Sequence, residues 1–209
     1  MTDFIWGHLG NVSNKNAKDS DSDDDTNDET AVYRNQNEIW FNCGVNAKNI
    51  DSLIKLVYEI VHDEKLSAYR ENNNLEIIIH IDSSGGYVSS AFKFIDFMQC
   101  LKKKGVKFKS IINGKACSSA TLIAIVADSR QITQHSYAMI HELSSGVYGK
   151  ITEIRSYQKH LDMCHKHIIE TYITHNPALT VETIEAIMTS ERWFSAQEYK
   201  TMGFVNDII

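Results

Sequence analysis

The chain has 209 residues, 43% of them hydrophobic, and a formal net charge of −6. This size and composition suit one compact domain, with or without a tail. The acidic balance argues against a nucleic-acid binder, which needs a basic face to neutralise phosphates, and there is no uncharged apolar run of the roughly 18 residues that a membrane-spanning helix needs.

The cysteines and the first residues of the chain point to an intracellular protein. Cys43, Cys100, Cys117 and Cys164 are widely separated and form no CxxC pair, which is typical of reduced thiols. The N-terminus lacks the basic start and apolar core of a secretory signal, and it is acidic where a transit peptide would be rich in arginine. We therefore expect a cytoplasmic location.

Residues 1–35 differ in composition from the rest of the chain. Residues 19–25 read Asp-Ser-Asp-Ser-Asp-Asp-Asp, and Asp28 and Glu29 follow closely. Like charges repel, and almost nothing apolar is available for burial, so we predict a disordered acidic tail before a folded domain at residues 36–209. The tail could be a removable pro-segment, an interaction segment or a solubilising extension.

Beyond the tail, the hydrophobic periodicity predicts alternating strands and helices. The β-branched run at residues 75–81 suits a buried strand. The predicted elements are, in chain order, a strand over 39–41, a helix over 50–61, the strand over 75–81, a helix over 88–98, a strand over 106–112, a helix over 116–127, strands over 130–134 and 137–141, and a long helix over 151–174. This order predicts an α/β fold with a largely parallel sheet and right-handed crossovers.

A glycine pair follows the predicted strand over residues 75–81. Residues 82–86 read Asp-Ser-Ser-Gly-Gly and precede a predicted helix. In open α/β sheets the ligand site lies beyond the carboxyl ends of the strands, and glycines there allow unusual backbone angles and close approach of a ligand. The segment is also compatible with an ordinary strand-to-helix turn, and it matches neither phosphate-binding pattern, GxxxxGK[ST] or GxGxxG.

A second glycine-containing turn between a strand and a helix follows the next predicted strand. Residues 113–120 read Asn-Gly-Lys-Ala-Cys-Ser-Ser-Ala, and we expect a strand to end at the glycine and a helix of small residues to follow. A serine at that helix start would expose its hydroxyl at the sheet edge, and the next N–H could stabilise a tetrahedral oxyanion. Ser118 could instead cap the helix, and Cys117 and Ser119 are rival nucleophiles that spacing alone does not separate.

A serine nucleophile needs a base at neutral pH, and His141 is the candidate among nine histidines. It ends the predicted strand over 137–141, so it lies on the same sheet edge as the two turns, although a histidine can also end a strand without any role. His160, Cys164 and His167 align at i, i+4 and i+7 on the long helix. They lack an obvious fourth ligand, so we expect no metal site and no cofactor.

Taken together, these segments resemble the proteolytic subunit of the Clp protease family. The similarity runs from about Glu38 to the end of the chain, and four motifs occur in the family's order. They are the oxyanion loop at 81–86, the nucleophile motif at 114–120, the histidine strand at 137–141, and the C-terminal segment at 191–196 with 203–208.

The resemblance implies a nucleophile at Ser118, a base at His141 and an orienting acid at Glu191. The family has aspartate at the third position, but a glutamate can also accept the imidazole N–H, as in Ser-His-Glu sites on other folds. Glu191 could equally be an ordinary helix-end carboxylate. Two more positions depart from the family: Ser84 stands where a proline is usual, and Ser119 replaces a larger apolar side chain.

The same resemblance implies that the N–H groups of Gly86 and Ser119 form an oxyanion hole beside Gly85. Residues 143–147, beginning with Leu143, would pair with extended substrate as an added strand. The implied fold is crotonase-like, with repeated β-β-α units and a protruding handle helix at 151–174. Subunits would self-associate into stacked seven-membered rings, and an AAA+ unfoldase would supply unfolded polypeptides, with no nucleic acid or membrane involved.

The motifs favour a serine endopeptidase that works inside a ring-shaped chamber. A catalytically inactive relative that only builds or shapes the ring is the alternative, and the departures at Glu191 and Ser84 favour it. Acyl-CoA chemistry on the related crotonase-type fold is a third hypothesis, but that class has no Ser-His pair. The cleavage preference, the ATPase partner, the processing of the tail and the number of chain types in the ring stay open.

Overall fold

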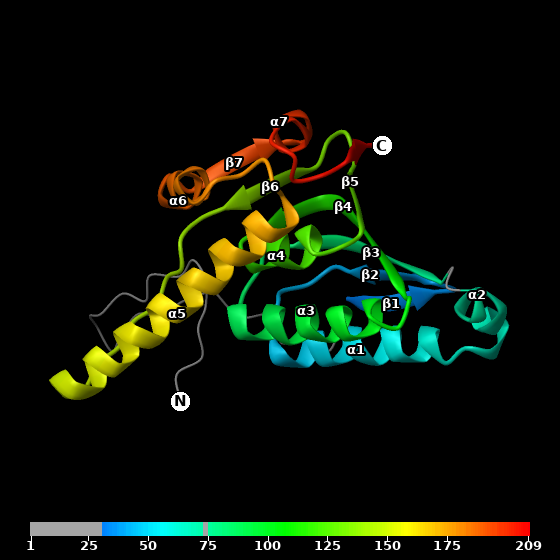
Figure 1. Cartoon of the computed structure of the whole chain (residues 1–209), viewed down its shortest axis with the longest axis horizontal. Coiled ribbons are helices and arrows are strands. Elements are labelled where there is room, and N and C mark those ends of the chain that lie inside the picture. Colours follow the sequence, from blue (N-terminus) through cyan, green and yellow to red (C-terminus); the bar gives the residue numbers. More distant parts are fainter. Residues whose placement is uncertain (1–30, 73–74) are drawn as a thin grey trace, which may run out of the picture.

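The computed structural model describes residues 31–72 and 75–209 (Figure 1). Most of the predicted acidic tail therefore lies outside the described residues. The boundary at residue 35 was wrong, because Val32–Asn35 form strand β1, which pairs with the next strand. The ring of Tyr33 stacks on that of Trp40, with 5.1 Å between centroids, so this short segment finds a packing partner that its composition did not indicate.

One mixed sheet of eight strands organises the chain, in the order β1-β2-β3-β4-β5-β8, with β6 paired to β4 and β7 paired to β6. The pairs β1–β2 and β6–β7 are antiparallel, and all the others are parallel. The α/β fold with a largely parallel sheet is confirmed. The strands are Val32–Asn35 (β1), Glu38–Phe41 (β2), Glu76–Ser83 (β3), Lys107–Cys117 (β4), Ser129–Ile132 (β5), Tyr137–Ile140 (β6), Arg192–Ser195 (β7) and Asp207–Ile208 (β8).

The helices pack their apolar stripes against this sheet and against each other. Helices α1 and α3 lie side by side along one face of it (Figure 1). Alternate residues of β3 are fully buried and the intervening ones are half-buried, so the core lies mainly on one side of this strand. The helices are Ala47–Val61 (α1), the short Glu64–Leu66 (η1), Ser67–Glu71 (α2), Val88–Lys102 (α3), Ser119–Ile125 (α4), Ile151–His175 (α5), Val181–Thr189 (α6) and Ala196–Thr201 (α7).

Strand β4 is longer than expected and changes neighbours along its length. Its first part pairs with β5, whereas residues 115–117 pair with β6. The register against β3 also shifts, so that Ser83 lies opposite Ala116. The chain therefore does not turn at Gly114 but continues as a strand to Cys117, because the shift bends β4 onto a second parallel partner. This bend brings the carboxyl ends of β3, β4 and β6 to one edge of the sheet.

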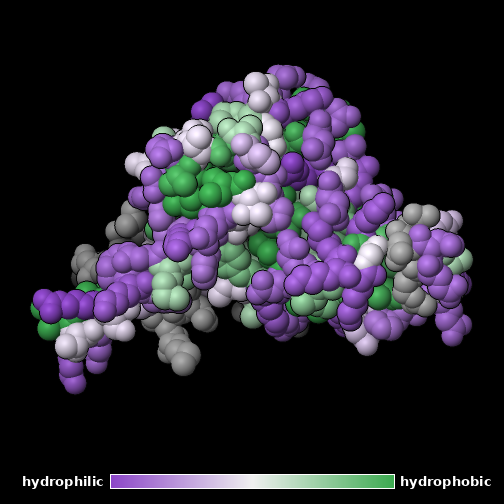
Figure 2. Space-filling view, viewed as in Figure 1, coloured by the Kyte–Doolittle hydropathy of each residue, from purple (hydrophilic) through white to green (hydrophobic). Residues whose placement is uncertain are grey.

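Helix α5 divides into a packed end and a projecting part. Its buried residues, Ile168, Ile169 and Tyr172, all lie near its C-terminal end. The rest extends away from the body, and polar side chains cover most of it on the visible face (Figures 1 and 2). Within the part of the chain that the structure describes, no helix combines the length and the apolarity that crossing a membrane requires.

Candidate active site

The backbone of Ser118 is joined directly to the strand that leads to His141. Its N–H donates a 2.8 Å hydrogen bond to the carbonyl oxygen of Met139, and Cys117 pairs with the same residue in the β4–β6 register. Met139 precedes His141 by two residues, and His141 is the first residue after β6. The sheet thus brings these two candidate residues to the same edge, as the strand order predicted.

The glycine turn after β3 lies against Ser118. A Cβ atom built on Gly85 would come within 2.5 Å of the Cys117 carbonyl oxygen, 2.7 Å of the Ser118 Cβ and 3.1 Å of its Oγ. Gly85 also has φ +87°, a conformation that side-chain-bearing residues rarely adopt. Only glycine therefore lets this turn approach the serine so closely.

Ser118 itself has an unusual backbone conformation. Its φ of 57° and ψ of −131° place a non-glycine residue in a region that costs on the order of 1–3 kcal/mol and that is often found at functional sites. The side chain makes no capping hydrogen bond to helix α4, so the helix-cap alternative does not hold. The hydroxyl is buried, with the residue 1% exposed, and among the described residues it has no hydrogen-bond partner.

The two rival nucleophiles differ from Ser118. Burial raises the pKa of the Cys117 thiol to about 11, so it stays protonated at neutral pH and is a poor nucleophile. The Ser119 side chain is fully buried, and its hydroxyl also has no partner within the described chain. The close approach of Gly85, however, is to the Ser118 side chain, and this contact favours Ser118.

Two backbone N–H groups near Ser118 are the candidates for an oxyanion hole. The N–H of Ser119 belongs to the first residue of α4, and a helix offers no internal acceptor to its first N–H groups. Val45 forms a parallel bridge with Gly86 by accepting from Tyr87 N at 2.7 Å and donating to Gly85 O at 2.8 Å. This pattern leaves the N–H of Gly86 on the side that faces away from Val45.

His141 lies in an environment that favours a neutral imidazole. The residue is 8% exposed, and its pKa is lowered from 6.5 chiefly by burial, while the nearby carboxylates of Glu191 and Glu142 act in the opposite direction. A neutral imidazole at neutral pH is the form that can accept a proton from a serine hydroxyl.

Glu191 approaches His141 through the β6–β7 pairing. Ile140 lies opposite Arg192 in this antiparallel pair, so the next position along each strand brings His141 and Glu191 together. Glu191 has φ 49° and an exposed side chain, and its carboxylate acts on His141 electrostatically by raising the pKa of the imidazole. Glu142 is a second carboxylate near the ring that motif matching missed, although its position next to His141 could have suggested it.

Leu143 and the residues after it leave the sheet edge. Leu143 is half-buried and packs against the core, and residues 141–149 adopt no regular secondary structure. Residues 145–149 are exposed, and the added-strand role of this segment stays a prediction. The segment is tied to α5 by a 2.6 Å hydrogen bond between the hydroxyls of Ser145 and Tyr157.

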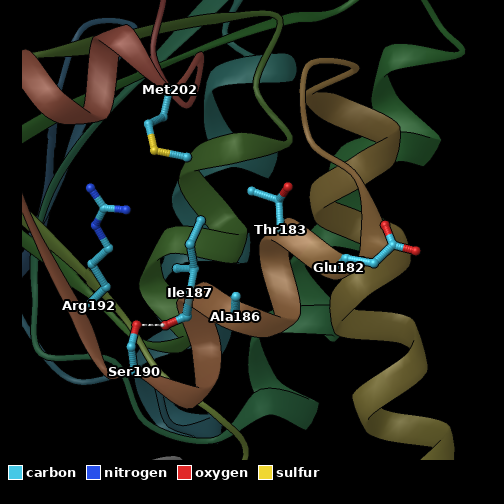
Figure 3. A pocket seen from close by; sticks show the side chains of 7 residues that line it. All are labelled: Glu182, Thr183, Ala186, Ile187, Ser190, Arg192 and Met202. Atoms are coloured by element: carbon cyan, nitrogen blue, oxygen red, sulfur yellow. Dashed lines mark hydrogen bonds between the residues drawn. The ribbon is translucent and has the colours of Figure 1, made fainter.

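A cavity of about 410 Å³ lies elsewhere, between α6, the start of β7 and the end of α7 (Figure 3). Its lining includes Arg192, next to Glu191, but none of the candidate catalytic side chains. In residues 31–72 and 75–209, no cluster of three or more histidine, cysteine or acidic side chains could hold a metal ion. His160 and Cys164 do approach each other, with 3.8 Å between Nε2 and Sγ.

The fold is that of an α/β protein. At one sheet edge it gathers a serine on a strained backbone, a histidine after the adjoining strand and a glycine turn against the serine side chain, a combination typical of serine hydrolases. The family model described as Clp protease matches residues 51–209. The match covers most of the chain, which therefore belongs to the Clp protease family, a family of serine peptidases. Membership favours a peptidase over the acyl-CoA alternative.

Proposed function

We propose that this chain is an active serine endopeptidase subunit. Ser118 Oγ attacks the scissile carbonyl carbon while the imidazole of His141 accepts its proton. The same proton then passes to the leaving amine, and water hydrolyses the acyl-enzyme with His141 again as the base. Glu191 accepts the other imidazole N–H and holds the tautomer, while the N–H groups of Gly86 and Ser119 stabilise the oxyanion.

The conformation of Ser118 carries this proposal. A buried hydroxyl without a hydrogen-bond partner in the described chain is costly, and so is a positive φ on a residue with a side chain. Both costs occur at Ser118. This residue lies against Gly85 and beside β6, the strand that His141 follows. The combination separates Ser118 from Ser119, whose hydroxyl is also buried without a partner in the described chain but whose φ is not positive.

The assembly that we propose follows from family membership. Clp proteases generally form rings that work with AAA+ ATPases, and we infer two stacked seven-membered rings that take in unfolded polypeptides. Residues 36–209 would form the crotonase-like peptidase domain, with α5 as the handle between rings. The projecting part of α5 supports this role, because an isolated 25-residue helix with so little burial gains little from packing within one chain.

A labelling experiment tests the enzyme directly. The assembled protein should react with a fluorophosphonate, and intact-mass analysis should show one adduct that peptide mapping places on Ser118. Ser118→Ala should abolish both the adduct and the turnover of a fluorogenic peptide, whereas Ser89→Ala, at an exposed serine of α3, should leave both unchanged. Equal turnover by the Ser118→Ala variant and the parent would remove Ser118 from the mechanism.

A non-catalytic ring subunit is the second candidate, because Glu191 is exposed and replaces the family's aspartate. The same probe separates the two functions. A correctly assembled ring that takes up no label at Ser118 would support the structural subunit.

A further inference from the structure

The peptide unit that follows Ser118 is held by a neighbouring threonine. The carbonyl oxygen of Ser118 accepts two hydrogen bonds from Thr121, one from its backbone N–H at 3.0 Å and one from its Oγ1 at 2.6 Å. Both contacts come from within α4, and the side chains of Ser119 and Thr121 are fully buried. The carbonyl oxygen of this strained residue is therefore held at two points.

A tyrosine on another helix completes the contact. The hydroxyl of Tyr172, on the packed end of α5, lies 2.5 Å from Thr121 Oγ1. Thr121 has one hydroxyl hydrogen, and it donates that hydrogen to the Ser118 carbonyl. The Tyr172 O–H must therefore donate to Thr121, which gives a directed chain from Tyr172 through Thr121 to Ser118.

The environment of Tyr172 keeps these two side-chain hydrogen bonds in one arrangement. The residue is 0% exposed, and its ring packs edge-on against Phe204 with 6.1 Å between centroids. Burial raises the pKa of Tyr172 above its ordinary value, so the phenol keeps the proton that it donates. Hydrogen bonds of this kind reinforce one another in a buried setting.

The planarity of the peptide group connects these hydrogen bonds to the oxyanion hole. The Ser118 carbonyl and the Ser119 N–H belong to the same trans peptide group and point in opposite directions. Fixing the carbonyl oxygen toward Thr121 therefore fixes the Ser119 N–H in the opposite direction, away from the body of α4. We propose that Thr121 and Tyr172 are positioning residues that aim the Ser119 N–H at the oxyanion, an inference that rests on the proposed peptidase activity.

The test separates positioning from folding by measuring kcat and KM for a fluorogenic peptide in the assembled protein. Thr121→Val keeps the shape but removes the hydroxyl, and a misdirected oxyanion donor should lower kcat by about 10- to 100-fold. KM should change by less than about twofold, because the oxyanion forms only in the transition state.

Tyr172→Phe removes only the far end of the chain, so kcat should fall less, by about 3- to 10-fold. Because both substitutions interrupt one chain, the double variant should be no slower than Thr121→Val alone. Thr121→Ser keeps a hydroxyl and should restore kcat to within about threefold of the parent.

A matched control exists at the far end of the same helix. Ser110 Oγ donates a buried 2.8 Å hydrogen bond to the Ala124 carbonyl, so Ser110→Ala removes a similar bond away from the site. It should lower Tm by an amount comparable to Thr121→Val and leave kcat unchanged.

Three outcomes would overturn the inference: an unchanged kcat in Thr121→Val, an equal loss of kcat in Ser110→Ala, or no recovery in Thr121→Ser. They differ from failure of the proposed function. In that case the parent itself would show no turnover that depends on Ser118, and both proposals would fall together.

Discussion

The two sides of the candidate site are built differently. On the nucleophile side, Ser118 is buried, its backbone is hydrogen-bonded to Met139 and Thr121, and Gly85 lies against its side chain. On the acid side, Glu191 is exposed and directly precedes β7, which pairs with β6. The side chain on the first side is enclosed by several elements, whereas the carboxylate on the second side faces solvent even though its backbone N–H donates to Met188 O at 3.2 Å.

This difference indicates which substitutions each side tolerates. A site defined by backbone position has no room for an added atom, whereas an exposed carboxylate acts through charge that solvent partly screens. The exchange of the family's aspartate for Glu191 falls on the tolerant side. On the other side, Gly85, Gly86 and Ser118 match the family, whereas Ser84 and the smaller Ser119 depart from it without adding bulk against the serine.

Gly85→Ala should have the largest effect, because it disrupts the packing of the glycine turn against Ser118. The added methyl group would lie 2.5 Å from the Cys117 carbonyl oxygen, at a φ of +87° that alanine rarely adopts. We expect peptide turnover to fall by at least about 100-fold and stability to fall by roughly 1–3 kcal/mol, measured by fluorogenic assay and denaturant unfolding.

Gly44→Ala is the matched control for this change. A Cβ there would make an ordinary 3.5 Å contact with Gly85 O, so activity and stability should stay close to those of the parent. Full activity of Gly85→Ala would show that the turn does not define the site.

Glu191→Gln should have an intermediate effect on the acid side. Loss of a screened negative charge beside His141 should lower kcat/KM by about tenfold, far less than the loss seen when a buried triad acid is changed. Glu191→Asp keeps the charge and should stay within a few-fold of the parent. A greater loss in Glu191→Asp than in Glu191→Gln would mean that packing, not charge, is what this position supplies.

The pH profile should show the smallest differences. Because burial lowers the pKa of His141 below 6.5, the active neutral form should persist to a lower pH than for an ordinary histidine, and kcat/KM should fall as the pH drops through that lowered pKa. Glu142→Gln removes a charge that favours the imidazolium, so the acid limb should move to lower pH, by roughly a few tenths of a unit. An acid limb centred above 6.5, or one that moves to higher pH in Glu142→Gln, would contradict this assignment of the base.

Local patterns were sufficient to predict the elements that carry the site. The β-branched run before residues 82–86 and the strand before His141 were placed correctly, because each signal lies within a few neighbouring residues. The extension of β4 to Cys117 was missed, since it depends on a second parallel partner from later in the chain.

Contacts between distant side chains could not be predicted either. Thr121 reads as one more small residue in an apolar helix, and Tyr172 as one aromatic residue on a long helix. Only the packing of α4 against α5 brings their hydroxyls together. The backbone strain at Ser118 could not be predicted either, because the residue type gives no indication that a serine will have a positive φ.

The construction of the nucleophile side has a consequence for when proteolysis can begin. Gly85 and Ser118 follow the ends of strands β3 and β4, Met139 belongs to β6, and Tyr172 lies on α5, 54 positions after the serine (172 − 118). A partly synthesised chain carries the same serine as an ordinary, unreactive alcohol. Under the proposed function, peptide cleavage would therefore begin only when folding is nearly complete, and the immature polypeptide would not cleave its neighbours or itself.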